Sequence, residues 1–131
     1  MKENKIYLIF SGILVILFIT LNVRILIKRN NINKEYPILL ISDSLDETIS
    51  YKFSDDDFKY TPSALFFVTS SGRKMSISAK INPNFGDGSV GVNDVSEVSD
   101  RIIKKANNDT IYIYKNNPKD VSLYYFILSN D

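Results

Sequence analysis

The sequence predicts a small all-β domain, an antiparallel barrel of five or six strands, preceded by one N-terminal transmembrane helix. Two observations support this fold class. Residues 6–27 form one long apolar run, whereas residues 38–131 have an ordinary mixed composition. In this second region, short alternations of apolar and polar residues recur at roughly 10- to 15-residue spacing between clusters of turn-forming residues, which is typical of antiparallel β-structure.

Residues 6–27 are predicted to cross the lipid bilayer as a helix with the sequence IYLIFSGILVILFITLNVRILI, after a short lead at residues 1–5. At roughly 1.5 Å per residue this helix is about 33 Å long, against a hydrocarbon core of about 30 Å. The polar residues 28–37 are expected to form a juxtamembrane linker, and Tyr36-Pro37 stops the helix. A cleaved signal peptide is the alternative. The apolar run is longer than such peptides need, and no small-residue cleavage site follows it.

The charges that flank the helix leave its orientation open. Two lysines and the amino terminus precede the apolar run, while two arginines and two lysines lie in its last turns or shortly after it. Counting Lys and Arg alone favours a cytoplasmic domain. A short lead with two lysines and a free amine also resists crossing. We therefore expect a single-pass inner (plasma) membrane protein with an extracytoplasmic domain, and a cytoplasmic domain is the alternative.

The composition argues against several classes of function. Residues 1–30 carry five basic and one acidic side chain, net +4, whereas residues 31–131 carry eleven basic and fourteen acidic side chains, net −3. The domain therefore lacks the basic footprint of a nucleic-acid binder. The chain has no Cys and no His, so disulfides, thiolate ligands and the commonest general base are missing. Six acidic residues lie within residues 43–57 without the spacing or glycine of a calcium loop. We expect no metal, no cofactor and no catalytic site.

Three regions carry the predicted first half of the domain. Residues 38–41 are either a first strand or a segment laid over the edge of the domain. Thr48–Phe53 alternates like a half-buried strand, with Ile49, Tyr51 and Phe53 on its apolar side. Ala64–Thr69 and Lys74–Ile81 form a hairpin around Gly72, which can adopt the positive φ of a tight turn. In the second hairpin strand, Met75, Ile77 and Ala79 are expected in the core, with Ser76 and Ser78 in water.

The second half begins after the glycine-rich loop at residues 82–91. Asn93 is expected to cap a short helix through Val98. The strands 101–105, 110–115 and 121–128 follow. Closure into an OB-like or SH3-like barrel removes exposed strand edges, and a two-sheet β-sandwich is the alternative.

The last hairpin supplies the candidate partner face. If residues 116–120 form its loop, Lys115 pairs with Val121, and Ile111 and Ile113 point to the core. The opposite side of the hairpin then carries the possible partner face, Tyr112, Tyr114, Tyr124 and Phe126. Cross-strand aromatic pairs also stabilise sheets, so structural stability and capping are the favoured reason for these residues, and partner recognition is the alternative.

Three segments of the C-terminal third follow a recognisable pattern. Residues 99–104, SDRIIK, match G-D-S-[IL]-x-K, with Ser99 at the glycine and Arg101 at the serine; residues 108–114, NDTIYIY, match [SN]-D-[ST]-[IL]-Y-[VI]-Y; and residues 124–127 match Y-Y-F-[IVL]. The chain thereby resembles small uncharacterised single-span membrane-anchored β-domain proteins of Bacteroidota. The resemblance implies a compact β fold with a membrane tether, and it implies no activity.

Together these observations predict a non-catalytic binding or interaction module of the cell envelope. Its partners would be the lipid bilayer, through residues 6–27, and a membrane or envelope protein. The alternative is a small accessory subunit of a membrane complex that acts through its transmembrane helix. Ser11-Gly12, Thr20 and Asn22 are the small or polar groups that a partner helix would contact.

Overall fold

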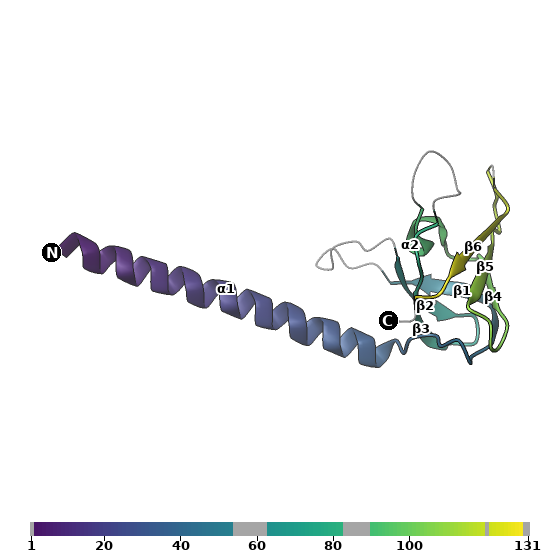
Figure 1. Cartoon of the computed structure of the whole chain (residues 1–131), viewed down its shortest axis with the longest axis horizontal. Helices are drawn as coiled ribbons and strands as arrows, with labels where there is room; N and C mark the ends of the chain where they lie inside the picture. The colour runs from purple at the N-terminus through teal and green to yellow at the C-terminus, as the bar shows by residue number, and fades with distance from the viewer. Residues whose placement is uncertain (1, 54–62, 83–89, 120, 130–131) are drawn as a thin grey trace. The chain divides into compact units, whose positions relative to one another are not determined.

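The computed structural model describes residues 2–53, 63–82, 90–119 and 121–129 (Figure 1). The acidic triplet at residues 55–57 and most of the glycine-rich loop lie outside the described residues. The chain divides into two compact units, residues 1–34 and 35–131.

The first unit is helical. The helix α1 runs over Lys2–Glu35, contains the whole apolar run, and is long and apolar enough to cross a membrane. Residues 28–35, expected as a linker, continue this helix, since none of them is a glycine or a proline. The helix ends where the sequence predicts, because the residue before Pro37 is disfavoured in the helical conformation.

The second unit contains one six-stranded antiparallel sheet in the order β3-β2-β1-β4-β5-β6. Two local three-stranded arrangements are joined by the pairing of β1 with β4, and a single turn of helix, α2, precedes β4. The bounds are β1 Leu45–Lys52, β2 Ala64–Thr69, β3 Lys74–Ser78, α2 Val92–Val95, β4 Arg101–Lys104, β5 Thr110–Tyr114 and β6 Leu123–Ile127. The described strands thus form an all-β domain with one sheet.

The sheet is open, because β3 and β6 do not pair along their lengths. Just beyond these two strands, Ala79 and Leu128 form an isolated antiparallel bridge. The amide of Lys80 donates to the carbonyl of Ile127 at 2.7 Å, and the amide of Ser129 donates to Ser78 at 2.9 Å. The two edges of the sheet therefore meet at one short contact.

The hydrophobic core lies on one face of this sheet, covered by α2 and by the segment that follows Pro37. Met75, Ile77 and Ala79 belong to the core, as predicted, and Gly72 has a φ of 84° in the turn before them. The α2 turn begins at Gly91 rather than at the predicted cap, and Asp94 accepts a hydrogen bond from the Gly91 amide at 2.7 Å. The buried core side chains are Leu39, Leu45, Ile49, Leu65, Phe67, Met75, Ile77, Ala79, Val92, Ile102, Ile111, Ile113, Phe126 and Leu128.

The prediction that Ser76 faces water is wrong: only 8% of this residue is exposed. The chain after α1 lies along the outer edge of β3. The Ser76 amide donates to Pro37 at 2.9 Å, the Leu39 amide donates to Ser76 at 2.8 Å, and the Ser76 hydroxyl donates to Tyr36 at 3.0 Å. Residues 36–39, which we call the edge strap, therefore cover the edge, which confirms the second of the two interpretations of residues 38–41.

A β-bulge in β1 corrects a second prediction. Ile49 pairs with Thr69 and Tyr51 pairs with Val68, so Ser50 is an extra residue between them. Alternation is interrupted there, and Tyr51 is exposed instead of pointing to the core. The Ser50 hydroxyl lies 3.0 Å from the carbonyl oxygen of Val68 and 2.9 Å from that of Thr69, which fixes the bulge.

Candidate interaction face

The pairing of β5 with β6 decides which tyrosines share a face. The structure pairs Ile111 with Phe126 and Tyr112 with Tyr125, one residue away from the predicted register. The physical reason is the loop: the Lys115 amide donates to Ser122 at 2.9 Å, so the loop holds residues 116–121, one more than expected. A slip of one residue moves every side chain of β6 to the opposite face.

Half of the predicted partner face is therefore misplaced. Tyr112 and Tyr114 do lie together on the side of β5 that points away from the core. Phe126 is 0% exposed in the core, and Tyr124 packs against the core. Assigning Tyr124 and Phe126 to the same face as Tyr112 was wrong.

Other residues of β4 and β6 complete the face around Tyr112 and Tyr114. Ile103 pairs with Tyr112, and Tyr114 pairs with Leu123. Tyr114, Tyr125 and Leu123 are 43%, 40% and 37% exposed, and the others are half-buried. The strands β4, β5 and β6 lie side by side in Figure 1. We call this surface the tyrosine face; it consists of Ile103, Tyr112, Tyr114, Leu123, Tyr125 and Ile127.

An ion pair borders the tyrosine face. The Arg101 guanidinium donates to both carboxylate oxygens of Asp46, at 2.7 and 2.8 Å. These hydrogen bonds lower the pKa of Asp46 and raise the pKa of Arg101. Arg101 is the β4 residue opposite Tyr114. The border of the face thus carries one positive and one negative group that neutralise each other.

On this outward side of the sheet, the half formed by β1, β2 and β3 is covered by residues of the edge strap. The ring of Tyr36 lies 6.1 Å from the ring of Phe66 on β2 and 5.8 Å from that of Phe53. The ammonium group of Lys74 is 5.8 Å from the centroid of the Tyr36 ring and pairs with the carboxylate of Glu35. Burial raises the pKa of Tyr36. The edge strap therefore shields the aromatic side chains near β2.

Two buried charged residues of the C-terminal pattern hold loops in place. Asp100 accepts hydrogen bonds from the Glu97 amide at 2.8 Å, the Lys115 ammonium at 2.6 Å and the Asn116 amide at 3.0 Å. Although burial opposes it, the hydrogen bonds to Asp100 and Glu97 raise the pKa of Lys115.

Lys104 plays a similar part at the other end of β4. Its ammonium donates to the carbonyls of Ile41 at 2.7 Å and Asp43 at 2.6 Å. Burial lowers the pKa of Lys104, against the attraction of Asp43 and Asp109. Through these hydrogen bonds to loop residues, Asp100 and Lys104 of the pattern stabilise the fold.

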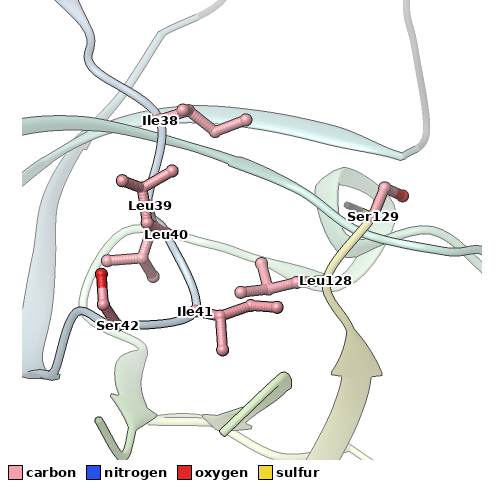
Figure 2. Close-up of a pocket in the computed structure, with 7 residues that line it drawn as sticks. All are labelled: Ile38, Leu39, Leu40, Ile41, Ser42, Leu128 and Ser129. Carbon is pink, nitrogen blue, oxygen red and sulfur yellow. The ribbon is translucent and has the colours of Figure 1, made fainter. Parts of the chain in front are cut away.

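An apolar groove of about 410 Å³ lies between the segment 38–42 and the end of β6. Figure 2 shows the side chains of Ile41 and Leu128 together in this groove. Apart from Ser42 and Ser129, its lining is aliphatic, so it offers no acid, base or cation to a ligand. Within the described ranges, no group of three acidic residues is placed to hold a metal ion, and no buried side-chain nitrogen or oxygen lacks a hydrogen-bond partner.

The sequence missed Ile103, Leu123, Tyr125 and Ile127 as members of the tyrosine face. Residues 123–128, LYYFIL, are apolar at every position, so their pattern fits either register. Only the conformation of the loop before them could have decided the pairing.

Comparison with known proteins identifies no relative of the chain. No protein-family model matches it, and no similar protein was found among curated sequences or solved structures.

Proposed function

We propose that this chain is a membrane-anchored, non-catalytic binding module of the cell envelope that recognises its partner through the tyrosine face. One observation carries the proposal: three large apolar side chains are exposed side by side over β5 and β6, while the matching surface over β2 is shielded by Tyr36. Contiguous exposed apolar surface is uncommon on soluble domains and often marks a binding site. Tyrosine suits such sites because it joins a large rigid ring to a polar tip.

The proposed anchor is the apolar part of α1 in the lipid bilayer of the inner membrane, with the domain outside the cytoplasm. Eight further helical residues, 28–35, add about 12 Å of chain beyond the apolar run. Tyr36 follows at once and is already buried in the domain. The domain would thus be tethered to the membrane by a short connection, so membrane or envelope proteins are its accessible partners.

Two finer features belong to the same proposal. The bridge of Ala79 with Leu128 supports a partly closed barrel, because it joins the two edges of the sheet. The φ of 78° at Ser99 supports membership in the Bacteroidota group that the chain resembles. Glycine, the usual residue there in the pattern, adopts such a φ without steric cost.

The alternative, an accessory subunit that acts through α1, has weaker support. The hydroxyls of Ser11 and Thr20 and the amide of Asn22 donate to carbonyls of their own helix, Asn22 at 2.7 Å to Phe18. These polar groups therefore need no second helix to satisfy them. Replacing residues 6–27 by an unrelated apolar span tests this alternative, which requires the exchange to abolish the partner interaction.

Site-specific photo-cross-linking tests the proposed face. A photoreactive amino acid replaces Tyr114 in the full chain, and the matched control replaces Tyr51, an exposed tyrosine of the same sheet outside the face. We expect cross-linked products from position 114 and few from position 51. Equal products from both positions, or none from position 114, would contradict the proposal.

Alkaline phosphatase fused to the C-terminus tests the orientation of the chain in the membrane. An inactive fusion would place the domain in the cytoplasm.

A further inference from the structure

We infer that the apolar groove between the segment 38–42 and the end of β6 binds an acyl chain of a phospholipid from the membrane that holds α1. The inference rests on the proposed anchor and goes beyond the proposed partner, because the groove shares no residue with the tyrosine face. Four consecutive aliphatic residues, 38–41, form one wall of the groove, and Leu128 lies opposite Ile41 (Figure 2). Its volume of about 410 Å³ is within the usual range for small-ligand sites, about 300–1,000 Å³.

The polar backbone groups around the groove are already engaged inside the domain. The amides of Leu39, Leu40 and Leu128 donate hydrogen bonds of 2.8 Å to other residues of the domain. The carbonyl of Ile41 accepts a hydrogen bond from Lys104. A peptide or a sugar would bury its own polar groups here without partners, which costs free energy. A hydrocarbon chain carries no such groups, so the lining favours an acyl chain.

Two side chains of the groove are exposed to a degree that a ligand would reduce. Ile38 is 45% exposed and Leu40 is 55% exposed, whereas Leu39 between them belongs to the core. The segment therefore presents apolar surface beside an apolar groove. Covering this surface with a hydrocarbon chain removes it from water, which is favourable.

The short connection to α1 limits the distance of the groove from the bilayer. Residues 28–35 extend the helix by about 12 Å, and the three steps from Glu35 to Ile38 add at most about 11 Å. Ile38 is therefore no more than about 23 Å from the end of the apolar run, and the headgroup region fills roughly 5–7 Å of this distance. The remainder is close to the length of one acyl chain, about 15 Å or half of the hydrocarbon core. A lipid can thus keep one chain in the bilayer and place the other in the groove.

A photoreactive lipid tests the site with the full chain in phosphatidylcholine vesicles. The probe is a phosphatidylcholine that carries a diazirine at the end of one acyl chain. In an ordinary bilayer lipid this end lies near the midplane, so it reaches the domain only when the acyl chain leaves the bilayer. After irradiation, trypsin releases residues 35–52 and 120–131, which carry the groove, residues 6–24 of α1, and residues 106–115 as an internal control.

We expect the label on residues 35–52 and 120–131 to exceed that on residues 106–115 at least about tenfold, although the control carries the exposed Tyr114. Label on residues 6–24 without this excess would overturn the inference and leave the anchor standing. No label on residues 6–24 would contradict the anchor as well. If a diazirine on the headgroup labels residues 35–52 and the chain-end probe does not, the segment only touches the bilayer surface, and the inference is overturned.

Variants separate binding in the groove from general exposure to lipid. Leu40→Glu places a charge in the groove and should lower the label on residues 35–52 at least about tenfold. The matched control is Tyr51→Glu, which should leave the label unchanged, because Tyr51 is 51% exposed and lies in the same tryptic fragment but outside the groove. Ser42→Trp, at an exposed position, obstructs the groove without adding a charge and should lower the label similarly. Undiminished label in the Leu40→Glu and Ser42→Trp variants would overturn the inference.

Discussion

Replacing Ser99 by glycine should stabilise the domain. Ser99 has a φ of 78°, in the left-handed region, and its side chain is exposed, so the change removes no buried contact. A side chain with a Cβ atom loses about 1–2 kcal/mol in this conformation. Glycine in turn costs about 0.5–1 kcal/mol through the greater freedom of the unfolded chain. The expected net gain is about 0.8 kcal/mol, which corresponds to about 3–6 °C in Tm for a domain of about 100 residues.

Thermal unfolding followed by circular dichroism measures this gain on the full chain in detergent. Two controls isolate the cause. Ser99→Ala keeps the Cβ atom and should give no increase in Tm. Asn107→Gly changes the second non-glycine residue with a positive φ in the described part of the chain, with a φ of 56°, and should gain less, because asparagine tolerates this conformation. A Ser99→Gly variant no more stable than Ser99→Ala would refute the reasoning from φ.

Three further predictions concern stability. In urea titrations, Ile77→Ala should lower the free energy of unfolding by about 2–5 kcal/mol, whereas Ser78→Ala should lower it by less than about 0.5 kcal/mol. Similar losses would mean that the core side and the outer side of β3 are wrongly assigned. A fragment of residues 35–131 should give a β-type circular dichroism spectrum, whereas residues 43–131 should unfold at lower urea because the edge strap is missing; equal midpoints would deny the strap a structural role. The hydrogen bond of the Ser71 hydroxyl to Glu47, 2.6 Å long, lowers the folded-state pKa of Glu47 below the ordinary 4.5. The stability that ionised Glu47 adds to the fold is therefore fully present above pH 4.5 and is lost as the pH falls through the folded-state pKa of Glu47. The stability difference between the natural chain and Glu47→Gln should shrink in acid, and a constant difference across pH would contradict the assigned cause.

The features predicted correctly are those that a few neighbouring residues determine by themselves. Tyr36-Pro37 marks the end of α1, Gly72 marks a turn, and the alternation from Met75 to Ala79 assigns one face of β3. The β5–β6 register was missed because the hairpin is apolar on both sides and its loop is one residue longer than assumed. The bulge at Ser50 was missed because an extra residue in a strand leaves no local signal. The tyrosines of β5 were therefore placed on the correct side of the sheet, whereas Tyr124 and Phe126 of β6 were placed on the wrong side.

The pairing of β1 with β4 has a consequence for the order of folding. The hydrogen bonds within β1–β3 and within β4–β6 join residues close in the chain, whereas Thr48 pairs with Arg101, 53 residues later. Local pairings form before distant ones because less chain entropy is lost on closing a short loop. The two halves should therefore fold as separate units that dock late. Without β6, Ile111 and Ile113 lack their cross-strand neighbours Phe126 and Tyr124, so we expect a chain in which residues 123–128 have not yet joined the sheet to expose apolar surface.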